Sequence, residues 1–334
     1  MFEYLKNKRV LLTGAGTLSY GLANDLKTEL AVYSRNESRQ HKFLEAYKDC
    51  KGYLGDIRDF ERITHVIRDF KPDIIIHTAA SKKVDVCEHE PILTVENNLV
   101  GTLNVGKAAW RNNVEAVIGI GTDKEVDPCT TYGRCKLLSS QILLDFDRLG
   151  DTKFSVVRYG NVTLSASSVL VKWLRDARLN QPIKITNPDM TRFLFTIKEG
   201  VELINYGLDK TLNNNGHGKI FSTKMCASTL SKLADAVISS TCSQSQKEII
   251  GARVAAEKIH ECLISNAELK DTIETKDFYS PIYAKKYTLS YFITSPGSNK
   301  SNVSSVFTSD IAPQLTSEEL INLILEAENT TWQG

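Results

Sequence analysis

The stretch RVLLTGAGTLSYGLANDL, residues 9–26, carries the strongest structural signal in this chain. A short apolar run leads into a turn that contains Gly14 and Gly16, and a helical pattern with Gly21 follows. Glycine permits a tight turn and lets the backbone approach a pyrophosphate, which then sits at the N-terminus of the next helix. We therefore predict a dinucleotide-binding strand–turn–helix unit, with these three glycines in the cofactor site. A purely structural turn is the alternative.

The alternation of short β-rich runs with amphipathic helical stretches continues to about residue 160. Such alternation indicates an α/β fold with a parallel sheet covered on both faces, which binds ligands at the carboxyl ends of its strands. We predict a Rossmann-like doubly wound sheet in a cofactor-binding and catalytic domain, residues 1–165. Residues 166–334 should form a smaller mixed α/β substrate-binding lobe, with some segments returning to the sheet. The predicted strands are 9–14, 30–35, 51–56, 73–79, 116–122 and 154–160.

The last part of the chain contains two contrasting segments. Residues 288–314 are rich in Ser, Thr, Asn and Pro, which predicts a mostly irregular excursion. The segment TSEELINLILEAEN, residues 316–329, predicts a final amphipathic helix. Thr316 and Glu319 have the spacing of a capping box at its start.

Composition excludes several classes of protein. The chain has 334 residues, 42% of them hydrophobic and 24% charged, as is usual for a soluble globular protein. A net charge of +1 without a basic block gives no electrostatic footprint for nucleic acid. The apolar runs are too short to span a bilayer and no signal peptide is recognisable, so we expect a cytoplasmic protein with no membrane partner. The seven cysteines are scattered and form no CxxC, which predicts reduced thiols and no metal site.

The end of the second predicted strand distinguishes between two cofactors. NAD sites commonly place an acid there for the ribose 2′-hydroxyl, whereas NADP sites place arginine. Here YSRNESRQ, residues 33–40, provides Ser34, Arg35 and Arg39 and no acid at the tip. Two guanidiniums and a hydroxyl suit a 2′-phosphate, so NADP is favoured. A solvated helix start is the alternative.

The third predicted strand ends in GDIRD, residues 55–59. Asp56 could accept a hydrogen bond from the adenine amino group of the cofactor. It could also simply cap the helix that follows.

Tyr132 and Lys136 form a YxxxK pattern, which places both side chains on one face of a helix. An ammonium beside a phenol, with an oxidised nicotinamide nearby, favours the phenolate and lowers the pKa of the tyrosine from about 10. Such a tyrosine can accept a hydroxyl proton while hydride passes to the cofactor. After the fifth strand of a dinucleotide-binding fold, this pattern is typical of the short-chain dehydrogenases/reductases.

Thr122 leaves the fifth predicted strand and is followed at once by Asp123 and Lys124. An Asp–Lys pair at a strand end is often only a solvated turn. At the carboxyl edge of this sheet it would instead face the space beside the nicotinamide. An acid for a leaving hydroxyl and a base for a carbon-bound proton together perform an elimination.

The order of these motifs resembles that of the UDP-GlcNAc 4,6-dehydratases, which are extended short-chain dehydrogenases/reductases. YSRNESRQ resembles YSRDExKQ, GDIRD resembles GDxRD, and TDKEVDPCTTYGRCK (122–136) resembles TDKAxxPxNxYGxxK with identical spacing. The resemblance covers residues 8–265. It also includes HTAASKKVDVCEHEP (77–91) with Asn98 and Gly101, RYGNV (158–162), MTRF (190–193), KIFSTK (219–224) and GARVAAEKIHE (251–261).

The resemblance implies a reaction on UDP-GlcNAc. Tyr132 would remove the 4-hydroxyl proton as hydride moves to NADP⁺, with Lys136 holding the nicotinamide ribose and Thr122 near the C4 oxygen. Asp123 would be the acid at the 6-hydroxyl and Lys124 the base at C5. Return of hydride to C6 leaves a UDP-4-keto-6-deoxy-HexNAc and restores the cofactor.

Further residues match binding positions of the family. Those implied for the cofactor are Ala79, Lys82 and Asn98, and those implied for the nucleotide-sugar are Lys82, Asn161, Arg192, Lys224, Arg253 and Glu257.

The resemblance also places the chain within a branch of the family. Membrane-anchored, C5-retaining members have methionine where this chain has Tyr132, so we expect the soluble, C5-inverting branch. Relatives form dimers, some of which assemble into hexamers, so a homo-oligomer is expected. Two departures are Glu125, where the family has Ala, and Thr130, where it has Asn.

Two other functions compete with dehydration. A UDP-sugar 4-epimerase also oxidises C4 but has no use for the pair Asp123 and Lys124. A non-catalytic NADP-sensing regulator would usually lack Tyr132 or Lys136, and both are present.

Overall fold

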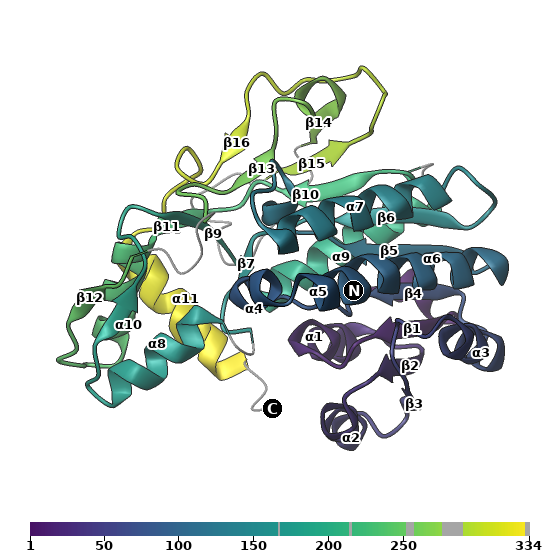
Figure 1. Cartoon of the computed structure of the whole chain (residues 1–334), viewed down its shortest axis with the longest axis horizontal. Helices are drawn as coiled ribbons and strands as arrows, with labels where there is room; N and C mark the ends of the chain where they lie inside the picture. The colour runs from purple at the N-terminus through teal and green to yellow at the C-terminus, as the bar shows by residue number, and fades with distance from the viewer. Residues whose placement is uncertain (166–167, 214–215, 252–256, 276–289, 331–334) are drawn as a thin grey trace.

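A computed structural model describes residues 1–165, 168–213, 216–251, 257–275 and 290–330. Within these residues the centre is a nine-stranded sheet in the order β14-β15-β10-β6-β5-β4-β1-β2-β3 (Figure 1). The part β3-β2-β1-β4-β5-β6 is parallel and has the strand order of a doubly wound dinucleotide-binding sheet. The predicted Rossmann-like fold is therefore confirmed. The strands are β1 Arg9–Thr13, β2 Glu29–Ser34, β3 Lys51–Leu54, β4 Ile74–His77, β5 Ala116–Ile120, β6 Lys153–Val157, β10 Ile220–Thr223, β14 Thr272–Thr275 and β15 Tyr291–Thr294.

All six predicted strands of the first half are present, but each ends earlier than predicted. The predicted ranges extended by one to three residues beyond the end of each strand. Those residues belong to the loops at the carboxyl edge.

Helices cover both faces of the sheet. Successive residues of β1 alternate between two cores, with Val10 and Leu12 on one face and Leu11 on the other. All three side chains are fully buried, which explains why the strand has a continuous apolar sequence. The first face is covered by α1 Thr17–Asp25, α2 Glu37–Ala46 and α9 Ile197–Asn213, and the second by α3 Phe60–Phe70, α6 Gly101–Arg111 and α7 Thr131–Phe146.

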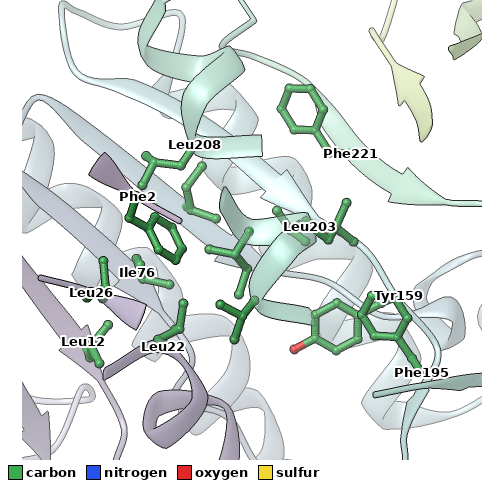
Figure 2. Close-up of a cluster of buried hydrophobic side chains, with 14 of the residues drawn as sticks. Phe2, Leu12, Leu22, Leu26, Ile76, Tyr159, Phe195, Leu203, Leu208 and Phe221 are labelled. Atoms are coloured by element: carbon green, nitrogen blue, oxygen red, sulfur yellow. The ribbon is translucent and has the colours of Figure 1, made fainter. Parts of the chain in front are cut away.

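Figure 2 shows the core on the first face. Leu12 and Ile76 of the sheet lie near Leu22 of α1, and Leu203 and Leu208 of α9 cover the neighbouring strands. Residues from beyond position 165 thus pack against the first half of the chain.

A second group of helices has a separate core and lies at one end of the molecule (Figure 1). Its last helix, α11, spans Ser317–Thr330. The predicted capping box is confirmed, because Thr316 N–H donates to Glu319 Oε2 at 2.7 Å and Glu319 N–H donates to Thr316 Oγ1 at 3.3 Å. This group contains α8 Val169–Arg178, α10 Leu230–Ser240 and α11, with strands β8 Ile183–Ile185 and β12 Lys247–Ile249.

The prediction of a mostly irregular chain over 288–314 is confirmed for the described residues 290–314, although two short strands interrupt them; residues 288 and 289 lie outside the described residues. β15 joins the main sheet antiparallel to β10, and β16 pairs with β13. Tyr291 of β15 stacks on Tyr206 of α9, with ring centroids 3.5 Å apart. The strand YFIT is aromatic and apolar, but the Ser- and Asn-rich residues around it hid this short signal.

Shorter elements connect these layers, and no helix among the described residues is long and apolar enough to cross a membrane. The short strands are β7 Asn161–Val162, β9 Thr191–Phe195, β11 Ala227–Thr229, β13 Cys262–Ile264 and β16 Phe307–Thr308. The short helices are η1 Glu3–Leu5, α4 Val84–His89, α5 Pro91–Thr94, a π-helical segment η2 at Val95–Val100, and 3₁₀ turns η3 at Asp123–Glu125 and η4 at Leu269–Asp271.

Candidate active site

The carboxyl ends of the parallel strands bring the predicted site residues to one edge of the sheet. Gly14 follows β1, Arg35 follows β2, Ala79 follows β4, Thr122 follows β5 and Asn161 follows β6. In a doubly wound sheet this edge is where ligands bind.

The glycine turn after β1 fits a pyrophosphate. Gly14 has a φ of 89°, and a Cβ there would lie 3.3 Å from Ala79 Cα. Helix α1 begins at Thr17, and its N-cap, Gly16, has no side chain to cap the helix; a Cβ there would meet open space. An anion at this helix N-terminus would therefore meet no N-cap side chain. Gly21 lies deeper in α1, where a Cβ would be 2.6 Å from Ile197 Cγ2, so its visible role is the close packing of α1 on α9.

Basic residues gather at the end of β2, where NADP was predicted. Arg35 Nη1 donates to Asn97 Oδ1 at 2.8 Å, and Asn36 caps α2 by accepting from Arg39 N–H at 2.9 Å. Desolvation, followed by the charges of Arg39 and Lys83, lowers the pKa of Lys82. Three cations, Arg39, Lys82 and Lys83, therefore lie close enough for their like charges to repel one another. Ser34, also predicted in this site, is buried at the end of β2.

Asp56 follows β3 and forms a local turn. Its Oδ1 accepts from Arg58 N–H at 2.9 Å and its Oδ2 pairs with the Arg58 guanidinium at 2.9 Å. Although burial opposes this, the contacts with Arg58 lower the pKa of Asp56. The residue that caps α3 is Asp59, which accepts from Arg62 N–H, so the alternative that Asp56 caps this helix was wrong.

Asn98 shapes the loop that follows β4. Its Oδ1 accepts from Ser81 N–H at 2.7 Å and its Nδ2 donates to Ser81 O at 2.9 Å. The residue lies in the π-helical segment η2, and such segments are frequent at functional sites. Asn98 therefore holds the backbone beside Ala79 and Lys82.

The turn after β5 places Asp123 and Lys124 at the carboxyl edge of the parallel sheet. Thr122 caps the 3₁₀ turn η3, and Glu125 completes a capping box. Asp123 is fully buried, and its Oδ1 accepts from Thr122 Oγ1 at 3.1 Å and from Lys124 Nζ at 3.0 Å. Its Oδ2 has no hydrogen-bond partner within the described part of the chain. Burial raises the pKa of Asp123, which favours the protonated carboxyl expected of a general acid.

Lys124 is surrounded by oxygen atoms from three segments. Its Nζ is 3.0 Å from Asp123 Oδ1, 3.0 Å from Asn161 Oδ1 and 3.3 Å from Glu261 Oε1. Burial opposes the charged form, but the carboxylates of Asp123 and Glu261 outweigh it and raise the pKa of Lys124. Lys124 is thus an ammonium in the protein alone and must lose a proton before it can act as the base that the resemblance implies.

Tyr132 and Lys136 lie in the first turns of α7, as the YxxxK spacing predicts. Burial raises the pKa of Tyr132, and the charge of Lys124 and a hydrogen bond with Thr122 only partly offset this. The lowering expected from Lys136 together with an oxidised nicotinamide stays a prediction. The Lys136 ammonium instead donates to the Ile120 carbonyl, and burial lowers its pKa.

The sequence analysis missed Glu261 as a member of this site. Glu261 precedes β13 and reaches Lys124, while Lys258 Nζ lies 3.7 Å from Glu261 Oε2. The only signal was its position as the last residue of GARVAAEKIHE, one of the motifs that resemble the dehydratases.

Glu125, one of the two departures from the family pattern, lies beneath the turn that carries Asp123 and Lys124. Its carboxylate accepts from Thr122 N–H at 3.1 Å, from Ser140 Oγ at 3.0 Å and from Arg158 Nε at 2.9 Å. Arg158 also pairs with Glu268 at 2.8 Å. Thr130, the other departure, caps α7 by accepting from Gly133 N–H.

The predicted substrate residues do not all reach the same place. Asn161 lies beside Lys124, and Arg192 Nε is 3.9 Å from Glu261 Oε1 while Nη1 donates to the Thr191 and Ile259 carbonyls. Lys224 pairs with Glu274 at 3.2 Å. Lys82 belongs to the basic group near β2, Glu257 is half-buried, and Arg253 lies outside the described residues.

Comparison with known proteins identifies the family of this chain. Residues 10–282 match the family described as "Polysaccharide biosynthesis protein". The chain is 32% identical to a protein of Rickettsia massiliae named UDP-glucose 4-epimerase, over 96% of both chains. It is 33% identical to the UDP-N-acetylglucosamine 4,6-dehydratase (inverting) of Campylobacter jejuni, over 96% of this chain and 98% of the relative.

A solved structure gives the same result for the fold. The X-ray structure of Pen from Bacillus thuringiensis superposes with a TM-score of 0.85 at 27% identity, covering 97% of this chain and 98% of Pen. The chain therefore belongs to the polysaccharide biosynthesis protein family, within the extended short-chain dehydrogenases/reductases that include nucleotide-sugar dehydratases and epimerases.

Proposed function

We propose that this protein is a UDP-GlcNAc 4,6-dehydratase, a hydro-lyase that forms a UDP-4-keto-6-deoxy-HexNAc with inversion at C5. The observation that carries the proposal is the buried pair of Asp123 and Lys124 beside Tyr132. An oxidation at C4 alone needs only Tyr132, Lys136 and Thr122. Removal of water requires an acid at the leaving hydroxyl and a base at C5: Asp123, whose pKa is raised, supplies the acid, and Lys124 supplies the base once its ammonium has lost a proton.

The cofactor in this proposal is NADP. The glycine turn and the uncapped start of α1 suit its pyrophosphate, and Arg35, Arg39 and Lys82 suit its 2′-phosphate. Bound NADP would accept hydride from C4 and return it to C6.

The residues of this chain carry the proton transfers. Tyr132 takes the proton of the 4-hydroxyl, with Thr122 hydrogen-bonded to the phenol. The ketone at C4 makes the proton at C5 acidic. Lys124, once deprotonated, takes that proton, and Asp123 gives its proton to the 6-hydroxyl, which leaves as water. Arg192 and Asn161 border this site on the side of the second lobe.

The second candidate is a UDP-sugar 4-epimerase, favoured by the names of relatives such as the Rickettsia massiliae protein. An epimerase returns hydride to C4 and removes no water. The buried arrangement of Asp123, Lys124 and Glu261 would then have no chemical task.

Product mass distinguishes the two reactions. The purified protein is incubated with UDP-GlcNAc and NADP, and the nucleotide-sugar is followed by mass spectrometry. A dehydratase gives a product lighter by one water, an epimerase gives an isomer of unchanged mass, and a regulator gives no product.

Asp123→Asn should abolish the loss of water while preserving bound NADPH formation in a single turnover. The proposal fails if the wild type loses no water, or if Asp123→Asn loses water as fast as the wild type. Running the wild-type reaction in D₂O reports exchange at C5 and the configuration there.

We also infer a homo-oligomer. Apolar side chains are exposed on neighbouring helices, with Ile92 of α5 at 77%, Leu103 of α6 at 40% and Leu138 of α7 at 46%. Exposed apolar groups gathered in one region are typical of association surfaces. Light scattering should show a dimer or hexamer. The substitution Ile92→Glu should shift the association equilibrium toward the monomer. A monomeric wild type would refute this inference.

A further inference from the structure

Glu261 is a buried carboxylate beside the proton-transfer residues that the proposed reaction has not yet used. Its side chain is only 4% exposed, and its Oε1 lies 3.3 Å from Lys124 Nζ. Lys258 Nζ is 3.7 Å from Oε2, and Arg192 Nε of β9 is 3.9 Å from Oε1. Glu261 therefore faces three cations, while Asp123 is the second carboxylate of the same cluster.

Tertiary contacts hold the Glu261 backbone in place. Its N–H donates to Ser309 Oγ at 2.9 Å, and its carbonyl accepts from Ser309 N–H at 2.8 Å. The neighbouring His260 Nδ1 pairs with Thr191 Oγ1 at 2.8 Å. The first residue of β9 and the residue that follows β16 thus fix the position of this carboxylate.

The number of oxygens around Lys124 selects its charged form. An ammonium has three N–H donors, and three side chains offer it an oxygen: Asp123, Asn161 and Glu261. A neutral amine has only two N–H groups, so one of these acceptors would lose its donor. The buried Oδ2 of Asp123 and the buried Oε2 of Glu261 have no hydrogen-bond partner within the described ranges.

We propose that Glu261 is a positioning residue that holds Lys124 as an ammonium and thereby sets the protonation of Asp123. The proposal rests on the proposed dehydration for its catalytic consequence, but its electrostatic part concerns the protein alone. Glu261 is not assigned a contact with the reacting atoms. It acts through Lys124 and Asp123.

The charges on the surrounding elements agree with this role. Despite burial, Lys124, Arg192 and Lys258 lower the pKa of Glu261, which keeps it anionic. Its negative charge in turn contributes to the raised pKa values of Asp123 and Lys124. Tyr132 on α7 also faces Lys124 and Asp123. Loss of the Glu261 charge should therefore lower the pKa values of both Asp123 and Lys124.

The first test compares the pH dependence of dehydration in the wild type and in Glu261→Gln. A charge at this distance shifts a pKa by about one to three units. In Glu261→Gln, each limb of the pH–rate profile that Asp123 or Lys124 sets should therefore move to lower pH by at least about one unit. Glu261→Asp keeps the charge and should keep the wild-type profile. Glu268→Gln is the matched control, because it removes a half-buried carboxylate that pairs with Arg158 instead of Lys124. The limbs of the pH–rate profile of Glu268→Gln should stay where they are in the wild type.

The second test needs neither substrate nor activity. In protein labelled with ¹³C at lysine Cε, the Lys124 signal is identified by its loss in Lys124→Arg. In the wild type it should titrate above the ordinary lysine value of about 10.4, and in Glu261→Gln its midpoint should fall. A wild-type midpoint at or below that value overturns the proposal without any Glu261 variant.

The two tests separate the two proposals. A wild type that shows the high Lys124 midpoint but releases no water from UDP-GlcNAc refutes the proposed function and leaves the coupling standing. A wild type that dehydrates its substrate, with an unchanged profile in Glu261→Gln, refutes the role of Glu261.

Discussion

Removal of the Glu125 carboxylate should strongly destabilise the protein, because it breaks a buried ion pair beneath the catalytic turn. Glu125 is fully buried, and the Arg158 side chain that it pairs with is 1% exposed. In Glu125→Ala, Thr122 N–H, Ser140 Oγ and Arg158 Nε all lose their acceptor. Breaking a buried pair from one side costs about 3–5 kcal/mol, because a buried charge is left without its partner.

In Glu125→Ala the Arg158 guanidinium keeps some of its partners, which determines where in that range the loss of stability should fall. Its Nη2 still pairs with Glu268 and its Nη1 still donates to the Leu263 carbonyl. We therefore expect a loss near the lower end, about 3 kcal/mol. The double variant Glu125→Ala/Arg158→Met should lose less than the sum of its two single variants, with a coupling of about 0.5–3 kcal/mol.

Urea unfolding followed by far-UV circular dichroism measures these changes. Glu29→Ala is the matched control, since the Glu29–Arg9 pair is exposed, with side chains 55% and 41% accessible. An exposed pair should contribute less than about 1 kcal/mol. The reasoning is refuted if Glu125→Ala loses no more stability than Glu29→Ala, or if the double variant is simply additive.

Three further changes test the site and the sheet. Tyr132→Phe removes only the phenolic hydroxyl and should slow formation of bound NADPH by about 10²–10⁴-fold in a single turnover; a rate near that of the wild type would remove Tyr132 from the proton transfer. Arg39→Ala should weaken NADP binding about tenfold more than NAD binding in fluorescence titrations, because only NADP carries the 2′-phosphate; equal losses would contradict the predicted NADP site. Burial lowers the pKa of His77 to about 3, whereas an unfolded histidine has a pKa of about 6.5. The unfolded state therefore binds a proton first as the pH falls, so stability should decline between about pH 6.5 and 3 by up to about 1.4 kcal/mol per unit, and His77→Gln should flatten that part of the curve in urea titrations. An identical slope in His77→Gln would show that other groups cause the decline.

Much of the fold follows from patterns that are local in the sequence. The apolar runs at the six strands, the glycine turn after β1 and the YxxxK spacing on α7 depend on residues close together in the chain. Parallel sheets then bring their carboxyl ends to one edge for reasons of connectivity, which is why Gly14, Thr122 and Asn161 could be expected together. The short strand β15 was missed because four residues carry too little periodicity against a polar background.

The sequence by itself determined which groups could do chemistry: the phenol of Tyr132, the carboxyl of Asp123 and the amine of Lys124. Only the tertiary structure decided their charge states. Burial raises the pKa of Tyr132, and Glu261, from a distant segment, supports the ammonium of Lys124. The physical reason is that pKa values depend on desolvation and on charges a few ångströms away in space, and neither is a property of neighbours along the chain.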